Sequence, residues 1–207
     1  MILAVDTSLG TAVALIDADG SLRADAAADD PLGHAEVIGV LLQQVVDDAG
    51  AGDITQVVAG MGPGPFTGLR IGIAAARAFA LGRAVPVIPV PSHFAAALTA
   101  IETDAVAGPF AIVTDARRRE VAVTVFDGLD DDGIPRVDAE TVLVPRADAD
   151  DLLAGIHRRD VAALSAVDLA RVGARAHAAG RTLAEAEPLY LRQPDVTLPG
   201  VPKRVGS

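Results

Sequence analysis

A polar turn near the start of the chain has the residue types that can hold a phosphate group. Asp6-Thr7-Ser8-Leu9-Gly10-Thr11 joins two apolar segments, and its glycine and hydroxyl groups would let backbone amides approach an anion. A plain hairpin with a capping aspartate has the same composition, however. The turn taken alone therefore favours a structural role over a chemical one.

A glycine-rich loop at 60–66 lies between a predicted strand and a predicted helix, where backbone N–H groups often bind phosphate. Its spacing does not match G-x-G-x-x-G, because Thr67 occupies the third glycine position. It does not match a Walker A loop either, since the only lysine of the chain is Lys203. Pro63 and Pro65 also remove two amide donors. We expect a rigid loop that orients the following helix.

The sequence offers no set of metal ligands or nucleophiles. No histidine has a second histidine three or four residues away, and Ile38 stands one helical turn after His34. The absence of cysteine excludes disulfides and thiolate sites, and no G-x-S-x-G motif occurs. We therefore predict no metal, no cofactor and no catalytic residue, and we find no support for a peptidase.

The one basic cluster is the turn 115–120, in which Arg117, Arg118 and Arg119 are consecutive. These residues are a candidate basic contact with RNA phosphates. The alternative is a solvated hairpin tip. The solvated tip explains the cluster at least as well as RNA contact does, because the chain is acidic, with 28 acidic and 17 basic residues and a net charge of −11.

Composition narrows the class of protein. The 207 residues are 51% hydrophobic, which is enough for a core, and the acidic charge argues against a free-standing binder of nucleic acid or anionic membrane. No uncharged apolar run is long enough to span a bilayer, and Asp6 interrupts the first one too early for a signal peptide. We expect a cytoplasmic protein that does not bind a membrane.

The elements that would position these residues follow a repeated pattern. Strands are predicted at 2–5, 11–16, 22–26, 56–59 and 85–90, and helices at 34–49, 67–81 and 92–101. Similar patterns follow Pro109, with strands at 110–114, 120–126, 137–144 and 161–164 and helices near 148–156 and 168–179. We predict an α/β fold of two lobes with a mixed sheet in each: residues 1–104, a smaller lobe at 105–192, and a flexible tail at 193–207.

Two helices of the first lobe have surplus apolar surface. Val37 and Val40 widen the apolar stripe of helix 34–49 beyond what a surface helix needs. Helix 67–81 has only two charges, Arg70 and Arg77, and contains two glycines one turn apart, which suggests close helix packing. The alternative is that the sheet and the neighbouring elements of the same lobe bury all of this apolar surface. We favour a helix-to-helix interface with a partner.

Several motifs together resemble the TsaB family, formerly called YeaZ. They are Ile2-Leu-Ala-Val-Asp-Thr-Ser8, Gly33-His-Ala-Glu36, Gly62-Pro-Gly-Pro-Phe-Thr-Gly-Leu-Arg-Ile-Gly72, Asp115-Ala-Arg117 with Glu120-Val121, and Pro188-Leu-Tyr-Leu-Arg192. The resemblance implies the two-lobed actin-like, sugar-kinase and Hsp70 (ASKHA) fold. It also implies a non-catalytic subunit that pairs with a TsaD-like paralogue in the transfer of threonylcarbamoyl to a tRNA adenosine beside the anticodon. A stand-alone ATP-dependent kinase or transferase of the same fold is the alternative.

The resemblance also implies partners and residue roles. The partners would be the TsaD-like paralogue, a TsaE-like ATPase and tRNA through the complex, with a homodimer when the chain is alone. Asp6, Thr7 and Ser8 match a vestigial phosphate turn. Pro65, Arg119 and Ala122 depart from the family pattern. The candidate interface residues are His34, Val37, Leu41, Gly68, Arg70, Gly72 and Phe79.

Overall fold

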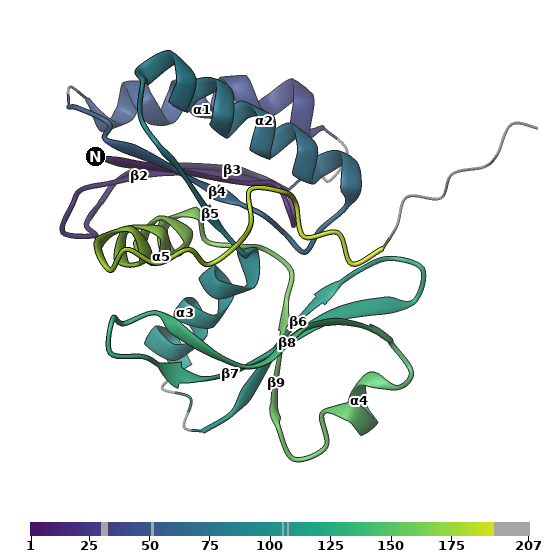
Figure 1. The fold of residues 1–207 in the computed structure, drawn as a ribbon. Helices are drawn as coiled ribbons and strands as arrows, with labels where there is room; N and C mark the ends of the chain where they lie inside the picture. Colours follow the sequence, from purple (N-terminus) through teal and green to yellow (C-terminus); the bar gives the residue numbers. More distant parts are fainter. Residues whose placement is uncertain (30–32, 51, 105, 107, 193–207) are drawn as a thin grey trace, which may run out of the picture.

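A computed structural model of the chain describes residues 1–29, 33–50, 52–104, 106 and 108–192, and these form two sheets with helices around them (Figure 1). The predicted tail at 193–207 lies outside the described residues. None of the helices within these ranges is long and apolar enough to cross a membrane.

The first sheet has the strand order β3-β2-β1-β4-β5. Its strands are β1 (Ile2–Asp6), β2 (Thr11–Ile16), β3 (Leu22–Ala28), β4 (Gln56–Gly60) and β5 (Val87–Val90). β1 and β2 are antiparallel, as are β2 and β3, whereas β1–β4 and β4–β5 are parallel. β5 is an edge strand, as its prolines predicted, because an edge tolerates the loss of a ladder donor.

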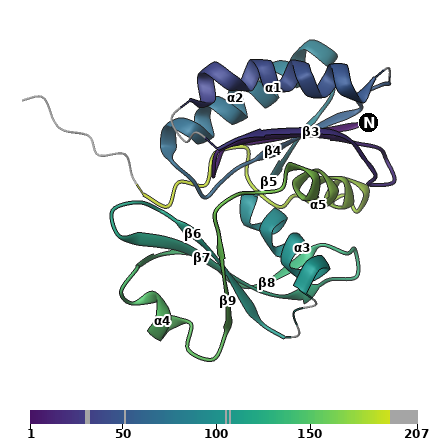
Figure 2. The ribbon, with the colours of Figure 1, turned by 180° about the vertical axis from the view of Figure 1, so that it is seen from behind.

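Successive residues of β1 point to opposite faces of this sheet, and each face has its own core. Leu3 and Val5 pack beneath α1 (His34–Ala49) and α2 (Phe66–Arg83), which cover one face. Ile2 and Ala4 pack on the other face with α3 (Ser92–Asp104) and α5 (Ala166–Ala178). Both views place α5 directly against the first sheet (Figure 2).

The second sheet has the order β8-β7-β6-β9, with β6 at Phe110–Asp115, β7 at Glu120–Leu129, β8 at Pro135–Pro145 and β9 at His157–Val161. β6 is antiparallel to β7 and parallel to β9, just as β1 is antiparallel to β2 and parallel to β4. This recurrence confirms the predicted α/β fold with two mixed sheets.

Some element boundaries were wrong in the second half. The helix predicted near 148–156 is the short α4 (Ala149–Leu152), and the strand predicted at 161–164 is β9, which ends at Val161. After β9 the chain returns to the first sheet as α5. The predicted boundary between 104 and 105 stays a prediction.

Candidate functional site

The polar turn after β1 is buried and bonded to the chain itself. The Ser8 amide donates to Asp6 Oδ1 at 2.7 Å, and the Ser92 hydroxyl donates to Asp6 Oδ2. The hydroxyls of Ser8 and Ser92 lie 2.8 Å apart. Burial raises the pKa of the Asp6 carboxyl, while hydrogen bonds from Ser92 and Ser8 act in the opposite direction. The carboxylate therefore has its partners inside the protein.

The loop before α2 and the first turns of α2 cover this polar turn. A Cβ atom added to Gly64 would lie 2.8 Å from the Ser8 Cα atom, and the Thr7 hydroxyl donates to the Gly68 carbonyl at 2.7 Å. Gly60, at the end of β4, leaves room for the Asp6 carboxylate, because a Cβ there would lie 1.8 Å from Asp6 Oδ2. Glycines thus let three segments meet at one point.

Four of the candidate interface residues face inward. His34 is 3% exposed, and its Nδ1 atom lies 2.8 Å from the Thr11 hydroxyl. A Cβ on Gly68 would lie 2.9 Å from His34 Nε2, and a Cβ on Gly72 would lie 2.1 Å from Thr7 Oγ1. Leu41 belongs to the core beneath α1. The two glycines therefore pack α2 against the polar turn and, at Gly68, against His34, the first residue of α1, so the predicted close packing occurs within the chain.

The remaining candidates lie nearer the surface. Arg70 is exposed, whereas Val37 and Phe79 are half-buried. On α2, four apolar side chains with helical spacing are exposed or half-buried: Ile71, Ala74, Ala75 and Ala78. On α1, Val40 is 65% exposed. We call this surface the outer face of α1 and α2. It comprises Val37, Val40, Ile71, Ala74, Ala75 and Ala78.

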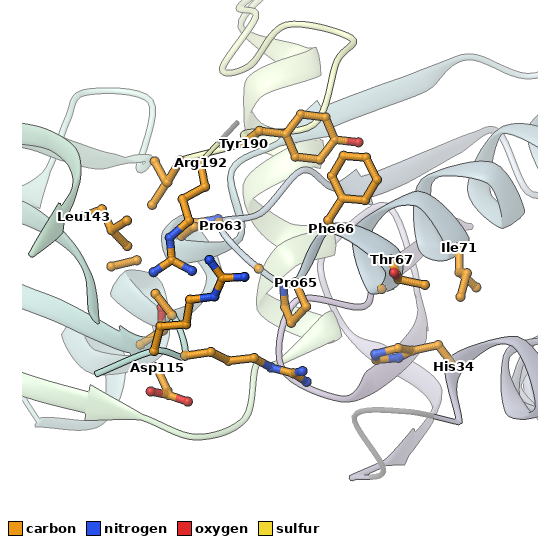
Figure 3. A pocket seen from close by; sticks show the side chains of 18 residues that line it. His34, Pro63, Pro65, Phe66, Thr67, Ile71, Asp115, Leu143, Tyr190 and Arg192 are labelled. Atoms are coloured by element: carbon orange, nitrogen blue, oxygen red, sulfur yellow. The ribbon is translucent and has the colours of Figure 1, made fainter. Parts of the chain in front are cut away.

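A cleft of about 520 Å³ separates the first lobe from the second (Figure 3). The loop 63–68 and His34 line one wall, and residues 114–118 line the other. Tyr190 and Arg192 close one end, and both extend into the view from the C-terminal segment (Figure 3). The cleft thus joins the glycine-rich loop to two of the three consecutive arginines.

The C-terminal segment ties the two lobes together. The Leu189 amide donates to the Met61 carbonyl at 2.7 Å. Tyr190 packs on Phe66 with ring centroids 4.8 Å apart, and the Tyr190 hydroxyl accepts from Arg70 Nε at 2.9 Å. Arg192 forms an ion pair with Glu120 of the second lobe. Arg70, a candidate for partner contact, therefore already holds this segment.

Ser92 and His93, at the start of α3, are two site residues that the sequence analysis missed. Ser92 bonds Asp6, and the His93 ring lies between the hydroxyls of Thr124 and Thr114, at 2.7 and 2.9 Å. Burial lowers the pKa of His93 from 6.5 to about 3. A single serine or histidine at a helix start is common, so no sequence signal marked either residue.

We expect His93 to make the protein less stable in acid. The unfolded chain binds a proton at His93 below about pH 6.5, but the folded chain does not until about pH 3. The free energy of unfolding therefore falls as pH drops through this window, by up to about 1.4 kcal/mol per pH unit from this group. Denaturant unfolding of His93→Gln between pH 7 and pH 4 should show a shallower loss than the parent.

Asp6 has the opposite effect on stability, because its raised pKa favours the folded state as pH falls. Asp6 is present in both the parent and His93→Gln, so its effect cancels when the two are compared. His177→Gln is the matched control, because it makes the same substitution at an exposed histidine. Equal slopes for the parent and His93→Gln would contradict the buried neutral histidine.

Comparison with known proteins assigns the chain to a family. The family model described as TsaD, tRNA N6-adenosine threonylcarbamoyltransferase, matches residues 32–138, slightly more than half of the chain. The chain belongs to the TsaD family. Within it, the chain falls in the TsaB (YeaZ) group. The solved structure of YeaZ from Pseudomonas aeruginosa has a TM-score of 0.77 and 25% identity, over 92% of this chain and 99% of that one.

Curated relatives match over shorter segments. A protein of Mycobacterium tuberculosis is 43% identical over 94 residues, which cover 44% of this chain and 42% of that protein. The tRNA threonylcarbamoyladenosine biosynthesis protein TsaB of Escherichia coli is 34% identical over 122 residues, 58% of this chain and 52% of that protein. The chain thus spans about half the length of these curated relatives.

Proposed function

We propose that this chain is a non-catalytic scaffold subunit that pairs with a TsaD-like paralogue and supports threonylcarbamoyl transfer to the tRNA adenosine adjacent to the anticodon. The observation that carries this proposal is the outer face of α1 and α2, where apolar side chains such as Val40 stay exposed. An apolar helix face of this kind is stabilised when a partner covers it. The TsaB relative and the TsaD family model supply the chemistry in which such a pair would act.

The site geometry supports a role without catalysis. Ile38 is buried in the core at the position where a second metal-binding histidine would stand, and the His34 ring pairs with Thr11. Among the residues that the structure describes, no three histidine or acidic side chains are grouped to hold a metal ion. We infer that Asp6, Thr7 and Ser8 form a vestigial phosphate turn, because their polar groups are already paired within the chain.

The rival hypothesis, a stand-alone kinase or transferase, needs these same groups for a nucleotide. Ser92 and Gly64 would have to move away from Asp6 and Ser8 before phosphates could approach. The scaffold hypothesis needs no such rearrangement. We extend the proposal to a TsaE-like ATPase and tRNA as further partners in the cytoplasm, and to a homodimer when the chain is alone.

Reconstitution of threonylcarbamoyl transfer tests the proposal. We expect the TsaD-like paralogue with its ATPase and a tRNA transcript to transfer the group at least tenfold faster when this chain is present. The chain without the paralogue should transfer none. Equal transfer with and without the chain, or transfer by the chain alone, would overturn the scaffold role.

A further inference from the structure

The C-terminal segment is anchored on the first lobe before it reaches the cleft. We call residues 184–192 the strap. Arg77 of α2 donates to the Ala186 carbonyl, and the Leu189 amide donates to the carbonyl of the buried Met61 at 2.7 Å. Backbone groups of the strap are thus bonded to the first lobe at two separate positions, so the strap moves with this lobe.

Side chains also fix the strap at the end of the cleft. The Arg70 guanidinium lies 3.7 Å from the centre of the Phe66 ring, and its Nε atom donates to the Tyr190 hydroxyl. A cation over the face of an aromatic ring is attracted by the negative charge of that face. Phe66 and Tyr190 both line the cleft (Figure 3), so this cluster attaches the strap to the first wall of the cleft.

Beyond Tyr190 the strap crosses to the second lobe. Arg192 forms an ion pair with Glu120, the first residue of β7, and the two side chains are 34% and 29% exposed. The Ala116 amide donates to the Glu120 carbonyl at 3.0 Å, so Glu120 and the second wall of the cleft move together. An ion pair this open to water is weak and is screened by salt. The contact that spans this end of the cleft is therefore easily broken.

The two walls are also joined where each begins, by Ser92 and His93 at the start of α3. The Gly62 amide donates to the Ser92 hydroxyl at 3.1 Å, and the His93 ring lies 2.9 Å from the Thr114 hydroxyl. Ser92 and His93 are both fully buried. Buried hydrogen bonds open less readily than exposed contacts do. The cleft thus has a firm connection at α3 and a weak one at the strap.

We propose that the Arg192–Glu120 ion pair is a latch that holds the cleft closed. When the ion pair breaks, the second wall swings away from the first about the buried connection at α3, while the strap stays anchored on α2. One packed core contains residues of both sheets, such as Ile2 and Phe110, so the swing is small. Because the latched and open states differ mainly by one exposed ion pair, charge and salt decide between them. The latch thereby controls access to the glycine-rich loop.

Distances between spin labels test the latch. The chain contains no cysteine, so Gln43→Cys on α1 and Glu140→Cys on β8 give two unique labels at exposed positions of the two lobes. For the labelled parent we expect one narrow distribution of distances. Arg192→Glu, which repels Glu120, should lengthen the mean distance by a few ångströms and at least double the width of the distribution. Arg192→Glu/Glu120→Arg should restore the parent distribution, because the ion pair forms again with its charges exchanged.

The matched control is Arg136→Glu, which reverses the charge of an arginine paired with Asp127 inside the second lobe. It should keep the parent distribution, and thermal unfolding should show that every labelled variant folds. Raising the salt concentration to about 1 M should shift the parent toward Arg192→Glu, because the Debye length falls to about 3 Å. An unchanged distribution in Arg192→Glu, an equal shift in the control, or a charge swap that stays open would overturn the latch.

Pairing with the paralogue does not enter these measurements, since the labelled chain is measured alone. If the parent and all the variants share one narrow distribution, the latch fails and the scaffold proposal stands. If Arg192→Glu opens the cleft but reconstituted threonylcarbamoyl transfer does not depend on the chain, the scaffold proposal fails and the latch stands.

Discussion

Gly72→Ala is expected to lower the free energy of unfolding by about 1–3 kcal/mol, although it adds only one methyl group. The new Cβ atom would lie 2.1 Å from Thr7 Oγ1 and 2.8 Å from Thr7 Cγ2. Since Thr7 is buried and its hydroxyl donates to the Gly68 carbonyl, it has no open space into which to move. Denaturant unfolding followed by circular dichroism would measure the loss.

Gly82→Ala on the same helix is the matched control. A Cβ at Gly82 has no neighbour within 4 Å, so alanine should leave stability unchanged or raise it by up to about 1 kcal/mol. Thr7→Ala should recover part of the loss caused by Gly72→Ala, because it removes the two closest atoms of Thr7. Equal stability of the Gly72 and Gly82 variants would contradict the close packing of α2 on the polar turn.

Ala74→Arg/Ala78→Arg is expected to weaken association with the TsaD-like paralogue at least 100-fold while leaving the fold intact. Both alanines are exposed on the outer face of α1 and α2, so arginine can extend into solvent in the free chain. In a complex, the same side chains would place two unpaired charges in an apolar interface. Titration of the paralogue, with analytical ultracentrifugation for the homodimer, would measure the change.

Ala178→Arg near the end of α5 provides the control, since it adds an arginine at an exposed helix position far in sequence from the outer face. It should associate like the parent. Normal association of the Ala74/Ala78 variant would show that the partner binds elsewhere. Loss of association in both variants would point to an effect of charge in general.

Local patterns in the sequence were sufficient to predict most of the secondary structure. Alternating apolar residues and turn residues specify strands such as β1 and β2, and the helical spacing of apolar residues specifies α1. The second half was harder, because α4 is a single turn and its neighbouring strand β9 contains charged residues. Short or polar elements have too few periodic positions to define their ends.

The candidate site was predicted only in part. The motifs located the polar turn, the glycine-rich loop and the basic turn, but the side of α2 on which its glycines pack was not predicted. A helical-wheel projection shows which residues share one face of a helix, whereas the fold decides which segment packs against that face. For Gly68 and Gly72 the neighbours include the turn after β1, about sixty residues earlier in the chain, and Gly68 also packs against His34.

The sequence by itself determined the acidic charge, the absence of cysteine and of histidines at metal-binding spacing, and the motifs shared with the TsaB group. Only the tertiary structure decided which polar groups meet: Ser92 with Asp6 across 86 residues, and Arg70 with Tyr190 across 120. The physical reason is that composition and periodicity are local properties of the chain. Contacts between distant segments depend on strand order and on how the helices pack over the sheets, which no single segment encodes.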